Sequence, residues 1–408
     1  MPPLIDAANR RVSLDPRDPA FFNDPYPAYR AIQAAAPVFF WEQYGHWCFS
    51  RHADVSALLR DRRFGRQILH VASRESLGWP EPPEHLEPFH AIERHSLLEL
   101  EPPEHTRLRG LVNRAFVSRQ VERLAPRIEA LAHQLIDGFE AVGEAELISA
   151  FATPIPVAVI AELIGVPFEM APRLLDWSHR MVAMYQFGVT RAAEDSAADA
   201  SRDFGRFVRD CVAERRLAPK DDLFSRLLEA EADGGRLNED ELVTTCVLLL
   251  NAGHEATVHG IGNALKAILE NDRADEVRAA DAAEAMVDEL LRYDAPLHLF
   301  TRYALQDVEV HGVALRKGER IGLLLGAANR DPEVFTAPDR LDLGRAVNPH
   351  VAFGAGIHFC VGAPLARLEM RIALPILLRR LPGLRLAAPP RYRDAFHFHG
   401  LEALRARW

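Results

Sequence analysis

The sequence of 408 residues predicts a mainly α protein with a small β region. Residues 120–141 and 281–292 carry apolar side chains three and four positions apart, which is the period of an amphipathic helix. Strand-like stretches with turn residues occur at residues 37–50 and 307–325. The 28 prolines divide much of the remainder into short helices and loops. We therefore expect a mainly α protein with a minor β part, and the length alone suggests about two or three domains.

Each strand-like stretch has its own turn signals. In residues 37–50, PVFFWEQYGHWCFS, we expect the turn at Tyr44-Gly45. In residues 307–325 we expect turns at Gly312 and at Lys317-Gly318. Glycine accepts the left-handed backbone that tight turns require. Both stretches therefore predict strand–turn–strand units.

Composition favours a globular protein and argues against several classes of function. Hydrophobic residues make up 48% and charged residues 26%, and the formal net charge of −10 gives no support for nucleic-acid binding. Four cysteines, at positions 48, 211, 246 and 360, are too few and too scattered for a disulfide framework, and no CxxC pair is present. The N-terminus lacks the apolar core of a signal peptide, and no stretch approaches the ~20 apolar residues of a membrane span. We expect a cytoplasmic monomer without a membrane anchor.

A long helix is expected over residues 239–270. Asn238 suits its N-cap, and Glu241 stands three positions later, as in a capping box. The run CVLLL is apolar on every face and predicts burial, yet the next ten residues, NAGHEATVHG, bring several polar groups. Two interpretations follow. Either a functional site lies in the middle of the helix, or the helix packs closely at Gly253 and its polar side chains lie in solvent.

Cys360 stands just before another expected helix. Pro364 suits the first turn of that helix. Backbone N–H groups at a helix N-terminus stabilise an anion such as a thiolate. Glycines at 354, 356 and 362 let the backbone approach something flat or bulky. Cys360 is therefore either a ligand or, as lone cysteines often are, an inert core residue.

The residues around Cys360 form a longer pattern, F-x-x-G-x-x-x-C-x-G. Its fixed positions are Phe353, Gly356, Cys360 and Gly362. The run FGAGIHFCVGAPLAR resembles the soluble bacterial members of the cytochrome P450 family, and the resemblance extends from about residue 20 to about residue 404. It implies the cytochrome P450 fold in one domain over residues 1–408, with haem b (iron protoporphyrin IX) beside this loop. It also implies that Cys360 is the thiolate ligand of the iron.

Two other segments carry the same resemblance. Glu289 and Arg292, in DELLRYDAP, match the E-x-x-R of the family. Arg340, in APDRLDLGR, stands where the family has the arginine that joins this pair. By pattern alone, Glu289 and Arg292 lie opposite an apolar face, which indicates a solvated ion pair of little energy. The resemblance implies instead a buried structural group near the haem loop, and we expect this arrangement because three separated segments agree.

The resemblance also implies which residues bind the haem propionates. EPPEHTRLRGLVNRAF resembles the family helix with this role and contains His105 and Arg109, four positions apart. Arg302 and His358 are implied to join them. Carboxylates are bound by cations and N–H donors, so these residue types suit the role. Singly, each has an ordinary alternative, such as a helix-start residue for His105 or a strand-edge charge for Arg302.

The polar segment of the long helix resembles the family's A-G-x-[DE]-T-T, which lies on the oxygen side of the haem. Ala252 and Gly253 are implied to leave room for oxygen and to lie beside the cofactor. Glu255 is implied to be the acid of an acid–alcohol pair that relays protons. His254 occupies the variable position, and no chemistry is assigned to it.

The alcohol of that pair is missing from its usual position. Ala256 directly follows the acid, and Thr257 comes one position later, where the helix has turned by ~100°. Three explanations are open. A substrate hydroxyl and ordered water replace the alcohol, or Thr257 or Asn251 holds the water, or the protein activates oxygen poorly. We favour the first two together.

The expected substrate is a hydrophobic small molecule. Family analogy assigns its pocket to segments that are mostly apolar, with scattered imidazoles. These residues are His95, Leu98, Leu248, Asn251, Ala252, Ala256, Leu297, His298, Leu299, Phe300, His397 and Phe398. The histidines hint at a polar or acidic group on the substrate. Ordinary core packing is the alternative for the aromatic residues.

Electrons are expected to come from separate proteins, because the chain ends eight residues after Gly400 with no reductase attached. Despite the net charge of −10, a set of arginines is expected on the thiolate side of the haem. The set comprises Arg107, Arg114, Arg119, Arg367 and Arg371. It favours docking of an acidic iron–sulfur ferredoxin, which a flavoprotein reductase reduces in turn. A scattered, solvated set of arginines is the alternative.

Together these expectations describe a haem-thiolate monooxygenase that inserts one oxygen atom from O₂ into a hydrophobic substrate. One alternative is a peroxide-driven haem oxygenase. Glu255 weakens it, since fatty-acid peroxygenases of the family carry an Arg-Pro type arrangement there. The other alternative is a haem-based ligand carrier or sensor without turnover, which Ala256 keeps open.

Overall fold

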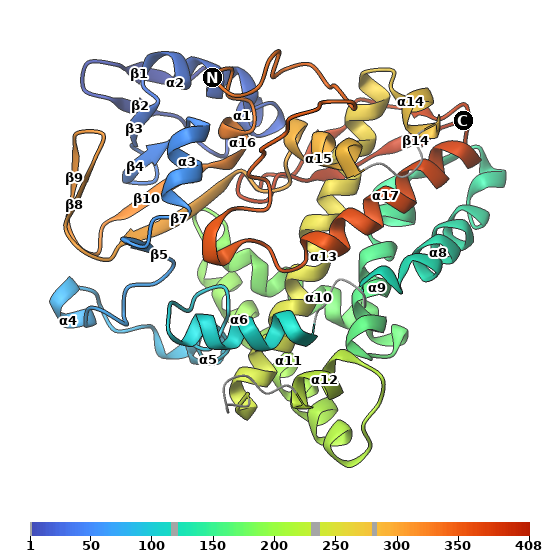
Figure 1. Ribbon diagram of the computed structural model, residues 1–408, viewed down its shortest axis with the longest axis horizontal. Helices are drawn as coiled ribbons and strands as arrows, with labels where there is room; N and C mark the ends of the chain where they lie inside the picture. Colours follow the sequence, from blue (N-terminus) through green and yellow to red (C-terminus); the bar gives the residue numbers. More distant parts are fainter. Residues whose placement is uncertain (1, 116–120, 230–236, 280–283) are drawn as a thin grey trace. The chain divides into compact units, whose positions relative to one another are not determined.

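The computed structural model describes residues 2–115, 121–229, 237–279 and 284–408. Helices dominate and strands are short (Figure 1), so the prediction of a mainly α protein with a small β region is confirmed. Contacts divide the chain into two compact units. The first unit comprises Met1–Gly65, Ala125–Ile155 and Ala256–Trp408, and the second comprises Arg66–Leu124 and Pro156–Glu255. The organisation as one domain stays a prediction.

The first unit contains a seven-stranded sheet with the order β1-β2-β3-β4-β10-β7-β5. Its strands are β1 Leu4–Asp6, β2 Arg11–Ser13, β3 Val38–Trp41, β4 His46–Phe49, β10 Arg320–Leu324, β7 Leu299–Ala304 and β5 Phe64–Gly65. β10 pairs parallel to β4 and antiparallel to β7, so strands from the two ends of the chain meet in the middle of the sheet. Shorter pairings involve β6 Glu144–Glu146, β8 Val308–Val310, β9 Val313–Leu315, β11 Arg385–Leu386, β12 Arg391–Tyr392, β13 Leu401–Ala403 and β14 Arg405–Arg407.

Both strand-like stretches form strands with the expected turns. β3 and β4 form an antiparallel hairpin, and Gly45 between them has a φ of 68°. β8 and β9 form a second hairpin around Gly312, whose φ is 69°. Gly318, with a φ of 93°, then turns the chain into β10. The second stretch therefore divides, because its last strand leaves the hairpin and joins the large sheet.

The hydrophobic core of the first unit covers both faces of this sheet. Successive strand residues point to opposite faces, and Leu323 and Leu324 accordingly belong to two different apolar clusters. The cluster around Leu324 contains side chains of the helix α2 (Tyr26–Ala35). The cluster around Leu323 contains Val351 and Ala355, which begin the loop that leads to Cys360. The core thus anchors that loop on one face of the sheet.

The other helices of the first unit are mostly short. They are α1 Pro19–Asn23, α3 His52–Leu58, α8 Ala125–Asp137, α14 Ala274–Ala279, α15 Glu284–Tyr293, α16 Leu325–Ala328 and α17 Ala363–Arg380, with single turns at Glu140–Val142, Ile148–Ala152 and Gly356–His358. α17 packs against α8, α14 and α15. The helices expected over residues 120–141 and 281–292 correspond to α8 and α15. α8 ends at Asp137, where Gly138 follows, and residues 120 and 281–283 lie outside the described residues.

The second unit is helical. Its helices are α4 Arg74–Leu77, α5 Glu87–Glu93, α6 Glu104–Ala115, α9 Pro154–Ile164, α10 Ala171–Val182, α11 Arg191–Leu217 and α12 Leu223–Glu229, with single turns at Glu84–Leu86, Phe168–Met170 and Ala183–Tyr185. α11 packs against α5, α10 and α12 and so organises this unit.

The helix α13 (Glu239–Glu270) has the expected bounds. The N–H of Glu241 donates to Oδ1 of Asn238 at 2.9 Å, and the N–H of Asn238 donates to Oε2 of Glu241 at 3.0 Å. This reciprocal pair confirms the predicted capping box. α13 has 32 residues, but neither it nor any other helix among the described residues is apolar enough over a sufficient length to cross a bilayer.

Candidate functional site

The loop before Cys360 is held on a narrow path. Gly354 and Gly356 have φ values of 70° and 73°, a conformation that residues other than glycine rarely adopt. A Cβ atom on Gly356 would lie 2.5 Å from the carbonyl oxygen of Leu59. The N–H of Cys360 donates to the carbonyl oxygen of Phe353 at 3.1 Å and closes the loop. These constraints explain why glycines stand at these positions of the pattern.

Cys360 lies three residues before the first residue of α17 (Ala363–Arg380). This helix has 18 residues, and Gly362 is its N-cap. The thiol is half-buried and forms no disulfide. Burial raises the pKa of Cys48 and of Cys246, and raises the pKa of Cys211 to about 11. These three positions therefore oppose a thiolate. The helix N-terminus favours one, so Cys360 is the cysteine best suited to bind a metal.

Cationic residues that suit a carboxylated ligand occur in each unit. In the first unit, Arg302 lies on β7 with only 3% of its surface exposed, and His358 is half-buried at the end of the turn Gly356–His358. In the second unit, His105 is 2% exposed on α6, and Nε of Arg109 donates to Oδ1 of Asn113 at 3.1 Å. A buried arginine or histidine suits the binding of an anion.

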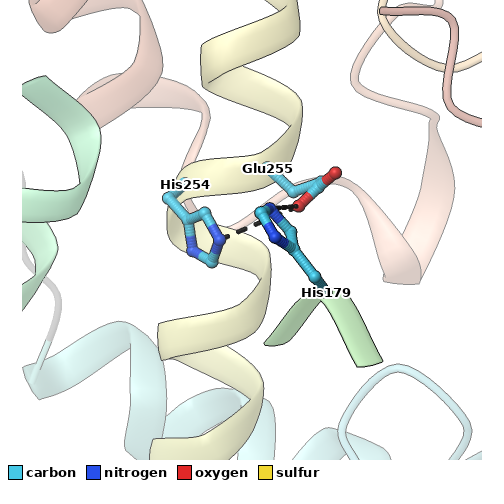
Figure 2. Close-up of side chains that lie close together, drawn as sticks. All are labelled: His179, His254 and Glu255. Atoms are coloured by element: carbon cyan, nitrogen blue, oxygen red, sulfur yellow. Dashed lines mark ion pairs between the residues drawn. The ribbon is translucent and has the colours of Figure 1, made fainter. Parts of the chain in front are cut away.

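The middle of α13 brings Glu255 together with two histidines (Figure 2). Oε2 of Glu255 lies 3.2 Å from Nε2 of His179, which is on α10, and 3.8 Å from Nε2 of His254. Nδ1 of His254 lies 2.9 Å from the carbonyl oxygen of Leu250. The sequence carries no signal for His179, because nothing in the pattern of α10 marks one histidine as facing a residue 76 positions away.

Known proteins resemble this chain over nearly its whole length. A family model described as Cytochrome P450 matches residues 274–382. The polyketide biosynthesis cytochrome P450 PksS of Bacillus subtilis (strain 168) is 34% identical over 97% of this chain and 98% of its own length. The chain belongs to the cytochrome P450 family.

Further comparisons agree with this assignment. Cytochrome P450 107B1 of Saccharopolyspora erythraea is 40% identical over 88% of this chain and 89% of its own. A solved structure of P450BioI, in complex with an acyl carrier protein that bears hexadec-9Z-enoic acid, superposes with a TM-score of 0.89 at 34% identity and covers 96% of this chain and 99% of that one. This P450 is therefore a monooxygenase that binds haem b. The half-buried Cys360 before a helix and the buried Arg302 fit such a group.

The P450 residues expected beside oxygen have well-defined packing. A Cβ on Gly253 would lie 2.7 Å from Cγ1 of Ile160 on α9, so close helix packing alone requires a glycine there. Nδ2 of Asn251 donates to Sδ of Met181 on α10 at 3.6 Å. Ala252 is exposed in the second unit, whereas Ala256 is half-buried and Thr257 buried in the first.

The structural group around Glu289 differs in one member from the prediction. Glu289 and Arg292 are both fully buried, and Nε of Arg292 donates to Oε2 of Glu289 at 2.7 Å. Arg345, not Arg340, supplies the second arginine, with its Nε 2.9 Å from the same oxygen. Arg340 is exposed and offers only its carbonyl oxygen, 3.3 Å from Nη2 of Arg292. The assignment of Arg340 was wrong because the loop turns between Arg340 and Arg345.

Some expected pocket residues of the first unit lie together. Leu297 and Phe398 form a β-bridge, and the N–H of His298 donates to the carbonyl oxygen of His397 at 3.3 Å. Leu299 and Phe300 follow at the start of β7. The side chain of His298 is fully buried, and its Nδ1 lies 2.8 Å from the hydroxyl of Tyr29. Its part in substrate binding stays a prediction.

The expected pocket residues of the second unit lie on a loop and a helix. His95 and Leu98 follow α5, and 37% of the surface of Leu98 is exposed. Leu248 is half-buried on α13. Their part in substrate binding stays a prediction.

Most of the arginines expected at the redox surface have acidic neighbours. Arg107 forms an ion pair with Glu241 in the second unit. In the first unit, Nε of Arg367 lies 2.7 Å from Oδ1 of Asp288, and Nη1 of Arg371 lies 3.7 Å from Oε1 of Glu284. Arg114 is exposed at the end of α6, and Arg119 lies outside the described residues. Exposure suits Arg114 to contact with an acidic partner, and the part of these arginines in docking stays a prediction.

Proposed function

We propose that this P450 inserts one oxygen atom from O₂ into a hydrophobic small molecule and takes electrons from an iron–sulfur ferredoxin and a flavoprotein reductase. The observation that carries the proposal is the constrained glycine loop that presents Cys360 at the N-terminus of α17. Haem with a thiolate ligand supplies the oxygen-activating chemistry when bound. A protein that only bound haem would not need the carboxylate that α13 carries at Glu255.

The roles of the cofactor-binding residues follow from their chemistry. Cys360 would hold the iron, with Phe353, Gly356 and Gly362 around it. Arg302 and His358 would pair with propionate carboxylates, and by the same resemblance His105 and Arg109 would do so too. Each of these side chains is a cation or an N–H donor, as carboxylates require.

Glu255 is proposed to hold and pass a proton. Its side chain is 10% exposed and lies beside His179, half of whose side chain is exposed, so a proton can enter from solvent through an imidazole. Asn251 and Thr257 are proposed to position water next to this carboxylate, in place of the alcohol that Ala256 lacks.

The substrate is proposed to be apolar because Leu297, Phe300 and Phe398 supply large apolar side chains to one part of the first unit. The names of related proteins include polyketide and biotin biosynthesis. The solved structure of P450BioI shows an acyl carrier protein with its acyl chain. A carrier-bound acyl chain is therefore the main variant of this proposal.

The substrate class is tested by titrating the purified ferric protein and following the low-spin to high-spin shift of the Soret band. The panel comprises fatty acids, terpenoids, aromatic acids and macrolide-like compounds. A saturable shift for one class is expected. If free compounds give no shift while an acyl carrier protein loaded with a fatty acid does, the substrate is carrier-bound. No shift with either argues for a sensor or carrier.

The axial ligand and the electron source need two further measurements. The ferrous carbonyl complex should show the spectrum of a thiolate-ligated haem, and Cys360→His should abolish it. Product should form with NADH, reductase and ferredoxin. Turnover with peroxide, but not with ferredoxin, would replace this proposal with the peroxide-driven alternative.

A further inference from the structure

Three metal-binding atoms converge at the middle of α13 (Figure 2). They are Nε2 of His179, Nε2 of His254 and a carboxylate oxygen of Glu255, and all lie within 4.8 Å of one another. Two come from adjacent positions of α13 and one from α10. The family resemblance implies a role for Glu255 only, and it implies none for His179 or His254.

The hydrogen bond of His254 shows which ring nitrogen faces this point. Its Nδ1 lies 2.9 Å from the carbonyl oxygen of Leu250, which can only accept a hydrogen bond. Nδ1 therefore carries a hydrogen, and Nε2 is the ring nitrogen on the side of Glu255, 3.8 Å from its Oε2. When Nε2 carries no proton, its lone pair can bind a cation that the carboxylate of Glu255 also binds.

The spacing suits a zinc ion. Zn²⁺ binds nitrogen and oxygen at about 2.0–2.2 Å with tetrahedral geometry, which places neighbouring ligand atoms roughly 3.3 Å apart. The observed distances from Oε2 of Glu255 are 3.2 Å to His179 and 3.8 Å to His254. Two imidazoles and one carboxylate also form a ligand set that binds zinc in preference to magnesium or calcium. The ligand atoms of the two histidines lie within 4.8 Å of each other, so they would approach by up to about 1.5 Å on binding zinc.

The surroundings give the site both support and access. The backbone of α13 is fixed beside it, because Gly253 packs directly on Ile160. Asn251 bonds to Met181, so α10 and α13 also touch next to the site. The side chain of His179 is 49% exposed, whereas that of Glu255 is 10% exposed. An ion can enter past His179 and meet ligands that are already positioned.

We propose that His179, His254 and Glu255 form a binding site for a zinc-class divalent cation, with water as the fourth ligand. The consequence for turnover rests on the function proposed above. A carboxylate that binds zinc cannot pass a proton, so the ion inhibits oxygen activation and reversibly ties α10 to α13.

The test measures zinc binding to the haem-loaded ferric protein by calorimetry, after removal of any affinity tag. One zinc ion per protein is expected. Binding should become at least about tenfold weaker in His179→Ala and in Glu255→Gln. The matched control is His85→Ala, which removes a histidine–glutamate pair of the same unit (Nε2 to Oε2 of Glu194, 2.9 Å) that belongs to no three-ligand group among the described residues.

The outcomes separate the possibilities. Equal weakening in His85→Ala, unchanged binding in His179→Ala, or no saturable binding at all overturns the site and leaves only a proton shared between His179 and Glu255. His179 is half exposed, so its replacement should preserve the fold, and an unchanged Soret spectrum checks this.

Turnover provides the second readout. Zinc should slow ferredoxin-driven product formation in the unaltered protein, but not in His179→Ala when each is compared with its own zinc-free rate. If no product ever forms, the proposed monooxygenase function fails while calorimetry still decides the zinc site. If product forms and zinc binds at this site without slowing it, the inhibitory consequence is wrong.

Discussion

At the scale of single residues, Glu93 has an environment that changes its acidity. Burial and the nearby carboxylate of Glu99 raise the pKa of Glu93 to about 7. The hydroxyl of Tyr185 donates to Oε2 of Glu93 at 2.9 Å, and Arg66 pairs with Glu99. The cluster connects the end of α5 and the following loop to the turn after α10. Glu93 is therefore partly protonated near neutral pH.

We predict that Glu93→Gln makes the protein more stable at pH 8 but not at pH 4. The unfolded chain releases this proton near pH 4.5, whereas the folded protein keeps it until about pH 7. Stability is therefore lost as pH rises through that interval, by roughly 1–3 kcal/mol. Glutamine keeps the acceptor for Tyr185 without a charge. Urea unfolding at both pH values measures the effect.

The control for this prediction is Glu87→Gln, which removes an exposed carboxylate at the start of α5 that pairs with Arg94, the residue directly after α5. It should show no comparable pH-dependent gain. Equal stabilisation of both variants at pH 8 would mean that reduced surface charge, and not burial of Glu93, causes the effect.

Ala256 carries a second prediction at this scale. Ala256→Thr should raise the fraction of reducing equivalents that end in product for at least some substrates, because it restores an alcohol directly after Glu255. The ratio of product formed to NADH consumed measures this fraction. A ratio that stays flat or falls for every substrate would show that proton delivery does not depend on this position.

At the scale of elements, Glu289 fixes the segment after α16 onto α15. Its buried carboxylate accepts from Arg292, from Nε of Arg345 at 2.9 Å and from the N–H of Asp342 at 2.9 Å. Arg345→Ala should destabilise the protein by roughly 1–3 kcal/mol, because a buried charge loses a donor. Arg340→Ala should cost less than about 0.5 kcal/mol, because its exposed side chain is not used. Thermal unfolding of the haem-loaded variants compares the two, and equal losses would contradict this account.

Features of the fold and site that depend on neighbouring residues could be predicted from the sequence, and features that depend on distant contacts could not. The bounds of α13, its capping box and the helix after Pro364 depend on neighbouring residues, so the pattern predicted them. The exchange of Arg345 for Arg340 depends on the path of a loop, and periodicity does not describe loops. His179 and the buried pairing of His298 with Tyr29 depend on contacts between distant segments. One chain without structure gives no signal for them.

At the scale of the whole molecule, a net charge of −10 opposes docking of an acidic ferredoxin unless local positive charge overcomes it. Arg114→Glu should slow reduction by ferredoxin roughly tenfold at low ionic strength and leave substrate binding intact. Stopped-flow reduction measures the rate. The control is Arg206→Glu on α11, whose side chain is 68% exposed and pairs weakly with Asp203. Equal slowing in both variants would indicate a general charge effect and remove Arg114 from the docking surface.

The order of strands in the seven-stranded sheet has a consequence for synthesis on the ribosome. β4 ends at Phe49, yet β7 begins only at Leu299, about 250 residues later, and the direct neighbour of β4, β10, begins later still at Arg320. At about 5–20 residues per second, the hairpin β3–β4 emerges roughly 10–50 s before its partners exist. During that interval its open edge and its apolar side chains are exposed to other nascent chains. Yield of this protein in cells should therefore depend on chaperones that bind early segments, and slower translation should lengthen that dependence.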